Sequence, residues 1–134
     1  VMGDAANALV FNNRLTALVV DDCKLTRMVY MHNLVNLGVE VKEVKNGKQA
    51  VDLFQSGEVF DLVLMDLEMP IMNGAQATKM LREMGVGTKI IGVTAHSKGP
   101  EQDAFMEAGL DECHEKPLTL ENLINILRDI DENL

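Results

Sequence analysis

The chain has 134 residues, a length typical of a single domain with its own hydrophobic core. Its 21 acidic and 12 basic residues give a net charge of −9, which argues against autonomous nucleic-acid binding, since such binding depends on phosphate neutralisation by Lys and Arg. No apolar run reaches the roughly 18 residues of a membrane-spanning helix, and two cysteines do not make a disulfide framework. We therefore expect a reduced, cytoplasmic or nuclear protein with an aliphatic core.

Along the chain, a small and polar leader over residues 1–13 is expected to be flexible, and residues 14–134 to form one domain. In that domain short apolar runs alternate with longer amphipathic stretches, which predicts five βα units and a parallel sheet covered by helices on both faces. The expected strands are residues 15–20, 39–44, 61–65, 89–93 and 111–114. The expected helices are residues 24–37, 47–56, 74–84, 101–108 and 120–131.

Local signals agree with these helix boundaries. Asn46 precedes Gln49 by three residues and Asn73 precedes Gln76 by three, and both pairs resemble capping boxes. Pro100 suits the first turn of the fourth helix, where no backbone donor is required. Four glycines follow expected helices, where a left-handed closing residue is often needed: Gly38, Gly57, Gly85 and Gly109.

Polar side chains stand where the expected strands stop. Asp21 and Asp22 follow the first strand, Asp66 the third, Thr94 the fourth and Lys116 the last. Because parallel α/β sheets bind ligands at the carboxyl edge of their strands, these side chains are expected to share one cleft. Three converging carboxylates repel unless a cation is present, and hard oxygen ligands favour Mg²⁺ over Zn²⁺. The alternative for the Asp21-Asp22 pair is that it merely caps the first helix.

Within this cleft Asp66 is the candidate nucleophile. A carboxylate can attack phosphorus and hold an acyl phosphate, which splits one transfer into two steps. Lys116 would supply a mobile positive charge to the phosphoryl group or to Asp66, and Thr94 would donate a hydrogen bond to a phosphoryl oxygen. Taken singly, Lys116 is an ordinary solvated charge and Thr94 an ordinary strand-end hydroxyl, and only their joint placement favours these roles.

Four motifs in the order of the chain resemble those of response-regulator receiver domains, over residues 15–134. The motifs are Val19-Val20-Asp21-Asp22, Leu64-Met65-Asp66-Leu67-Glu68-Met69-Pro70 with Asn73-Gly74, Val93-Thr94-Ala95, and Lys116-Pro117-Leu118. The resemblance implies an α/β, flavodoxin-like (βα)5 doubly wound parallel sheet of strand order 2-1-3-4-5. It also implies a cis Lys116–Pro117 bond.

The same resemblance implies a chemistry for the site. Mg²⁺ would be bound by Asp22, Asp66 and the backbone carbonyl of Glu68, with Asp21 acting through water. Asp66 would accept phosphate from a phosphohistidine, presented by a histidine-containing phosphotransfer protein or a sensor histidine kinase. The chain would act as a monomer, without nucleic acid or membrane, and would catalyse its own phosphorylation and dephosphorylation rather than work as a conventional enzyme.

One position departs from the usual receiver pattern. Receivers that switch an output carry Tyr or Phe three residues before the lysine, whereas this chain has Cys113, which we interpret either as a small buried residue or as a reactive thiol. This cysteine and its surroundings are similar to plant type-C response regulators, receiver-only proteins of the cytokinin-type phosphorelay, some of which remove phosphate from phosphotransfer proteins. The segments that carry the similarity are Leu81-Arg82-Glu83-Met84, Gly92-Val93-Thr94, Ala104-Phe105-Met106-Glu107-Ala108-Gly109-Leu110 and Glu115-Lys116-Pro117-Leu118-Thr119.

Residues beside the site raise two further hypotheses. Glu68 and His96 are expected to overlook the path of attacking water and to tune the lifetime of the phosphate. Met28, Met31 and Leu34 on the first helix either form a docking face for the partner or face the sheet.

Other interpretations stay open at this stage. A haloacid-dehalogenase-type phosphatase would also use Mg²⁺ and an aspartate nucleophile, but it normally carries a second aspartate where this chain has Glu68. A receiver module of a hybrid histidine kinase or transcription factor is a second alternative. A nucleotide-binding flavodoxin-like protein is disfavoured, because no G-x-G-x-x-G or P-loop motif is present.

Overall fold

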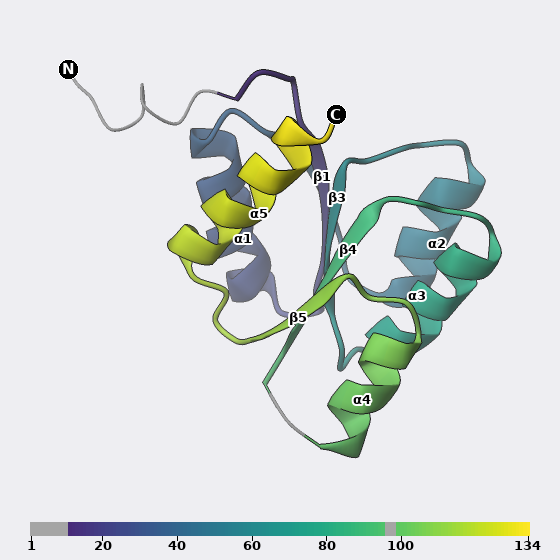
Figure 1. Cartoon of the computed structure of the whole chain (residues 1–134). Coiled ribbons are helices and arrows are strands. Elements are labelled where there is room, and N and C mark those ends of the chain that lie inside the picture. Colours follow the sequence, from purple (N-terminus) through teal and green to yellow (C-terminus); the bar gives the residue numbers. More distant parts are fainter. Residues whose placement is uncertain (1–10, 96–98) are drawn as a thin grey trace.

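The computed structural model describes residues 11–95 and 99–134, and in these residues five strands alternate with five helices (Figure 1). The strands are β1 (Thr16–Val20), β2 (Glu40–Val44), β3 (Leu62–Asp66), β4 (Lys89–Thr94) and β5 (Glu112–Glu115). The helices are α1 (Lys24–Asn36), α2 (Gly47–Gln55), α3 (Gly74–Glu83), α4 (Pro100–Glu107) and α5 (Leu120–Glu132). All ten expected elements are present, and each end lies within one residue of the predicted one.

The strands form one parallel sheet in the order β2-β1-β3-β4-β5, which confirms the predicted flavodoxin-like topology. Helices α1 and α5 cover one face of the sheet, and α2, α3 and α4 cover the other (Figure 1). Because every strand runs in the same direction, the residues that follow β1, β3, β4 and β5 all lie at one edge of the sheet.

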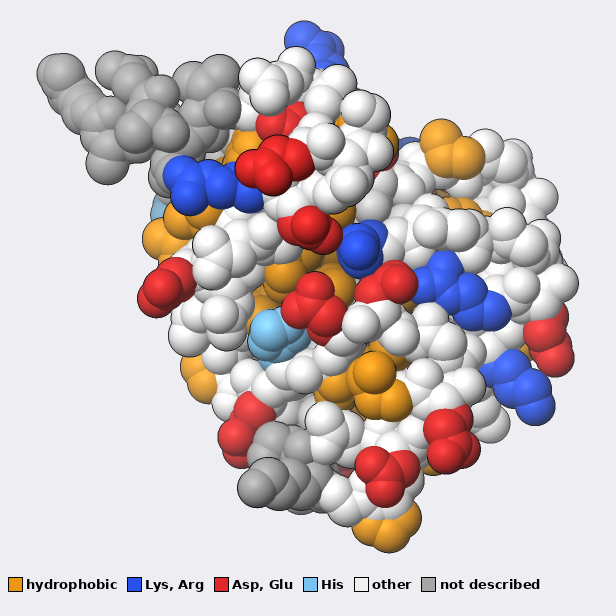
Figure 2. Space-filling model, in the orientation of Figure 1, with side chains coloured by type: hydrophobic (Ala, Val, Ile, Leu, Met, Phe, Trp, Pro, Cys, Tyr) orange, Lys and Arg blue, Asp and Glu red, His pale blue; other side chains and the backbone are white. Residues whose placement is uncertain are grey.

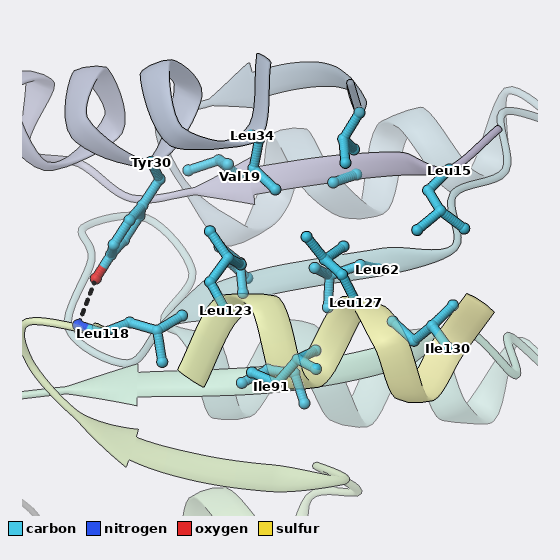
Figure 3. Close-up of a cluster of buried hydrophobic side chains, with 14 of the residues drawn as sticks. Leu15, Val19, Tyr30, Leu34, Leu62, Ile91, Leu118, Leu123, Leu127 and Ile130 are labelled. Carbon is cyan, nitrogen blue, oxygen red and sulfur yellow. Dashed lines mark hydrogen bonds between the residues drawn. The ribbon is translucent and has the colours of Figure 1, made fainter. Parts of the chain in front are cut away.

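Two hydrophobic clusters hold the helices to the sheet. On the α1 and α5 side, strand residues such as Val19, Leu62 and Ile91 pack against helix residues such as Leu34 and Leu127 (Figure 3). On the other side lie, among others, Leu18, Val63, Met65, Ala77, Leu81 and Phe105. Since alternate residues of a strand point to opposite faces, β1 and β3 are apolar except at Thr16 and Asp66, and their apolar side chains supply both clusters.

The helix caps agree with the sequence prediction in one case and differ in detail in the other. Asn73 and Gln76 form a complete capping box at α3. At α2, Asn46 Oδ1 accepts from the backbone N–H of Gln49 as expected, but Gln49 Oε1 accepts from the backbone N–H of Lys45 instead of Asn46. All four glycines predicted to close helices have positive φ, between 82° and 122°.

The segment just before β1 lies against the body of the domain. Phe11 packs on the cluster under α1 and α5, and the backbone N–H groups of Asn12 and Asn13 donate to the Asp131 carboxylate at 2.7 and 2.8 Å. The rest of the expected leader, residues 1–10, lies outside the described residues. Residues 11–95 and 99–134 include no helix that combines the length and the hydrophobicity needed to cross a membrane.

Charge is mixed over the surface despite the net value of −9. On the face that Figure 2 shows, acidic and basic side chains are interspersed with hydrophobic ones. Several charged side chains of the described residues are paired, among them Lys89 with Asp129 and Arg82 with Asp111.

Candidate functional site

The carboxyl edge of the sheet brings together the polar residues that the sequence predicts there. Asp66 is the last residue of β3, one position further than the expected strand end, and Thr94 is the last residue of β4. Asp21 follows β1 directly, and Lys116 follows β5 directly. Asp21, Asp66 and Thr94 are buried and Asp22 is exposed, so the site is a set of buried groups with one carboxylate at its mouth.

Lys116 joins the two buried carboxylates. Its Nζ lies 2.9 Å from Asp66 Oδ1 and 3.1 Å from Asp21 Oδ2. Asp21 Oδ1 also accepts the backbone N–H of Cys23 at 2.8 Å, which fixes the carboxylate at the start of α1. A charged hydrogen bond on each carboxylate is needed here, because an isolated buried charge is costly.

Burial and neighbouring charges set the protonation of these groups. Burial raises the pKa of Asp66 from 3.8 to about 6; the Lys116 hydrogen bond opposes the rise, and the negative charges of Asp21 and Asp22 add to it. Burial acts to lower the pKa of Lys116, but the hydrogen bond and charge of Asp66, with help from Asp21, outweigh it and raise the pKa. The raised pKa of Lys116 keeps its side chain an ammonium at neutral pH, between the carboxyl groups of Asp66 and Asp21.

The three aspartates form a compact oxygen cluster. One carboxylate oxygen from each of Asp21, Asp22 and Asp66 lies within 4.8 Å of the others. Such a set, without sulfur or imidazole, fits a hard divalent cation such as Mg²⁺. The exposed Asp22 leaves this cluster open to solvent on one side.

The loop after Asp66 owes its shape to a glycine. A Cβ at Gly74 would lie 2.1 Å from the Asp66 carbonyl oxygen, so no larger residue fits at the start of α3. The Gly74 N–H donates to the Leu67 carbonyl at 2.8 Å, which closes the loop. The Asn73-Gly74 pair of the sequence motif thus caps α3 and allows its first turn to pack directly on the backbone of the candidate nucleophile.

The loop before α5 is fixed to the neighbouring strand. The Lys116 backbone N–H donates to the Thr94 carbonyl at 2.8 Å, which extends the pairing of β4 and β5 to the site. The Lys116–Pro117 peptide is cis, as predicted.

The flanking residues occupy different surroundings. Glu68 is exposed and, with Asn73 and Glu101 among others, lines a groove of about 430 Å³ between the β3–α3 loop and α4. His96 lies outside the described residues. Cys113 is half-buried against the second hydrophobic cluster, and burial raises the pKa of its thiol although Gln102 opposes this, which favours the interpretation as a small packed residue.

Two residues beside the site were missed by sequence reasoning. Arg27 is buried, donates from Nη1 to the Asp21 carbonyl at 2.8 Å and pairs through Nε with Glu43 at 2.7 Å. Tyr30 is also buried, and its hydroxyl accepts the Leu118 N–H at 3.3 Å. Arg27, Tyr30 and Leu34 share the buried face of α1. The sequence signal that could have revealed Arg27 and Tyr30 is their position at the helical spacing at which apolar residues are expected.

Residues 17–128 match the response regulator receiver domain family, and the chain belongs to this family. A two-component receiver is thus the class of protein that the sheet and the acidic edge define.

Among individual relatives, the chain is 51% identical to two-component response regulator 24 of Arabidopsis thaliana over 118 residues, which are 88% of this chain and 85% of that protein. The predicted resemblance to plant type-C response regulators is therefore confirmed.

Solved structures of receiver domains are also similar to this chain. The receiver domain of the histidine kinase CKI1 of Arabidopsis thaliana, determined with Mg²⁺ and BeF3⁻, is 34% identical, with a TM-score of 0.73 over 88% of this chain and 90% of that one. The receiver domain of Ssk1 from Saccharomyces cerevisiae, crystallised with the histidine phosphotransfer protein Ypd1, shares the fold at 22% identity, with a TM-score of 0.82 and 91% coverage of each chain.

Proposed function

We propose that this receiver accepts a phosphoryl group from a phosphohistidine onto Asp66 and then hydrolyses it, so that it can drain phosphate from its donor. The observation that carries the proposal is the Lys116 ammonium held between Asp66 and Asp21 at 2.9 and 3.1 Å. A buried carboxylate with a cation at its side can both attack phosphorus and tolerate the charge that arrives with it.

In the first step an Asp66 carboxylate oxygen attacks phosphorus. The P–O bond forms as the P–N bond to the donor histidine breaks, and the imidazole leaves with the electron pair and takes up a proton. Lys116 shifts its hydrogen bonds from the carboxylates to the phosphoryl oxygens, and the Thr94 hydroxyl donates to another of them. In the second step water attacks phosphorus, the P–O bond to Asp66 breaks, and inorganic phosphate leaves the free carboxylate behind.

The carboxylate cluster supports a divalent cation as part of this site. Asp22 and Asp66, with the Glu68 carbonyl, would hold Mg²⁺, and Asp21 would contact it through water. When bound, the ion would neutralise charge on the phosphoryl oxygens and the carboxylates. The CKI1 receiver, whose structure contains Mg²⁺, is the relative that supports this assignment.

The exposed face of α1 is the proposed docking surface for the donor. Leu25, Met28 and Val29 are 72%, 55% and 56% exposed, whereas Leu34 is buried against the sheet. Beside them lies a pocket of about 210 Å³ that reaches Lys116 and Pro117. An apolar helix face next to the site suits a helical phosphotransfer protein that presents its phosphohistidine toward Asp66. The Ypd1–Ssk1 pair supports a partner of this kind, and the similarity to a plant two-component response regulator supports a plant phosphorelay as the setting.

The test is a time course with a ³²P-labelled phosphotransfer protein and Mg²⁺, following label on both proteins and as free phosphate. We expect label to leave the donor and appear mainly as free phosphate. Asp66→Asn should take up no acid-labile phosphate, while Asp103→Asn on exposed α4 should behave like the wild type. Normal labelling of Asp66→Asn would exclude this residue as the acceptor.

A second prediction concerns the cation. Asp22→Asn should weaken Mg²⁺ binding roughly tenfold or more, because a carboxylate ligand is lost while the buried part of the site is untouched. Isothermal titration calorimetry measures this directly, with Asp103→Asn again as the control. Equal affinity in wild type and Asp22→Asn would remove Asp22 from the metal site.

A further inference from the structure

The short loop that carries Lys116 is hydrogen-bonded to two different elements, β4 and α1. On one side the Lys116 N–H donates to the carbonyl of Thr94 in β4 at 2.8 Å. Two residues on, the Leu118 N–H donates to the hydroxyl of Tyr30 in α1 at 3.3 Å, a bond that Figure 3 shows crossing from the helix to the loop. Only Pro117 lies between the two fastened residues, so the backbone at Lys116 has little freedom to move independently of Leu118.

The bond to Tyr30 is made in the interior of the protein. Tyr30 is 3% exposed and Leu118 is 5% exposed, and both side chains belong to the cluster under α1 and α5. A buried N–H without an acceptor is costly, so the Tyr30 hydroxyl is a specific requirement for this loop rather than an accident of packing. A phenylalanine would fill the same space and leave the Leu118 N–H without this acceptor.

Tyr30 also borders the proposed docking surface. The 210 Å³ pocket beside α1 is lined by Tyr30, Lys116 and Pro117 together with Leu25, Thr26 and Val29. A side chain that enters this pocket from a partner therefore contacts both the helix and the loop that it holds in place.

We propose that Tyr30 is a positioning residue: its hydroxyl holds the Lys116–Leu118 loop so that the Lys116 ammonium reaches Asp66, and it thereby couples occupancy of the α1 pocket to phosphoryl chemistry. This inference rests on the proposed function, in which Asp66 accepts the phosphoryl group. Tyr30 itself touches no reacting atom and acts through Lys116.

The first test compares wild type with Tyr30→Phe, using acetyl phosphate as a donor that does not dock on α1. Labelling of Asp66 and loss of the label should both slow roughly tenfold, because a small displacement of a catalytic group has a large effect on rate. Mg²⁺ affinity should not change, since the aspartates keep their contacts. Ile130→Val is the matched control: it trims a side chain of the same buried cluster away from the loop and should label at the wild-type rate once folded.

A second measurement does not depend on the Tyr30→Phe variant being folded. Tyr30 is the single tyrosine of the chain, so biosynthetic incorporation of 3-fluorotyrosine places one ¹⁹F label at this position. The ¹⁹F signal should shift when Mg²⁺ and beryllofluoride are added, and the shift should be largely lost in Lys116→Met, where the connection to Asp66 is cut.

A failure of the role of Tyr30 and a failure of the proposed function give different outcomes. Equal labelling of wild type and Tyr30→Phe, or an equal ¹⁹F shift with and without Lys116, overturns the role of Tyr30 alone. Wild-type protein that takes no label from acetyl phosphate or from a phosphotransfer protein overturns the proposed function, and the role of Tyr30 with it.

Discussion

The ionic centre of the site combines two opposing effects on one carboxyl group. Burial and the negative neighbours Asp21 and Asp22 disfavour the charged form of Asp66, while Lys116 favours it. The result is a pKa of about 6 in the folded protein, above the ordinary value of 3.8. The folded state therefore binds this proton more tightly than the unfolded state does, and between about pH 4 and 6 the contribution of Asp66 to the stability of the folded state decreases as the pH rises. Above about pH 6 the full cost of the charged, buried carboxylate is present.

Removal of this charge should stabilise the metal-free protein. At pH 7 in EDTA we expect Asp66→Asn to unfold with a free energy higher than that of the wild type by about 1–3 kcal/mol, and the difference to shrink toward pH 4. Urea denaturation at several pH values measures it, with Asp103→Asn as the control for loss of an exposed carboxylate. A less stable Asp66→Asn protein at pH 7 would mean that the Lys116–Asp66 ion pair outweighs the cost of burial.

At the scale of the elements, one side chain fixes the end of α3 to the units that follow it. Arg82, in the last turn of α3, donates to the carbonyls of Val86, Thr88 and Gly109 at 2.8–2.9 Å and to the Asp111 carboxylate at 2.9 Å. Asp111 Oδ2 also accepts the Ile90 N–H at 2.8 Å. The guanidinium therefore joins α3, the start of β4 and the loop between α4 and β5, which together position Thr94 and Lys116.

Arg82→Lys tests how much these hydrogen bonds contribute to the stability of the protein. A lysine keeps the charge but cannot donate to four oxygens from a planar fork, so we expect a loss of about 2–4 kcal/mol in the free energy of unfolding. Chemical denaturation checks this, and Arg128→Lys on the exposed side of α5 is the matched control. If both variants are equally stable, the four hydrogen bonds contribute nothing beyond the charge.

At the scale of the whole molecule, the two ends of the described chain meet at the edge of the sheet away from the site. Asp131 in α5 accepts hydrogen bonds from the backbone of Asn12 and Asn13 and from the Asn13 side chain. Burial acts to raise the Asp131 pKa, but these hydrogen bonds outweigh it and lower the pKa. The contact therefore contributes stability above the unfolded pKa and loses it as the pH falls through the folded value.

Asp131→Ala should release the segment before β1 without changing the site. We expect faster amide hydrogen exchange at Asn12 and Asn13, because their acceptor is gone, and unchanged labelling of Asp66, because the site lies at the opposite edge of the sheet. Glu132→Ala, one residue further along α5, serves as the control. Unchanged exchange in Asp131→Ala would show that packing of Phe11 alone holds this segment.

The sequence predicts most of this architecture because its signals are local. The apolar runs that end in Asp21, Asp66 and Thr94 follow from strands buried on both faces, and the caps at Asn46 and Asn73 follow from residues three positions apart. Exposure divides the three α1 residues between the two interpretations, because Leu34 faces the sheet, Met28 faces solvent and Met31 lies half-buried between them; the docking face stays a prediction.

The features that the sequence does not reveal depend on pairs distant along the chain. Tyr30 meets Leu118 across 88 positions, and Arg82 meets Asp111 across 29. Arg27 and Glu43 are 16 positions apart and lie on different elements. Nothing in the neighbourhood of either partner specifies such a pair, because the fold itself brings the partners together.

The strand order has a consequence for how the site is completed while the protein is being synthesised. β1 and β3, which carry Asp21 and Asp66 at their ends, are central neighbours and can pair as soon as residue 66 has left the ribosome. Lys116 follows β5, an edge strand and the last strand to be made, so a nascent chain that ended after the first three units would hold these carboxylates without their ammonium. In such a chain a cation from the surroundings or protonation would have to relieve the repulsion that Lys116 relieves in the complete domain.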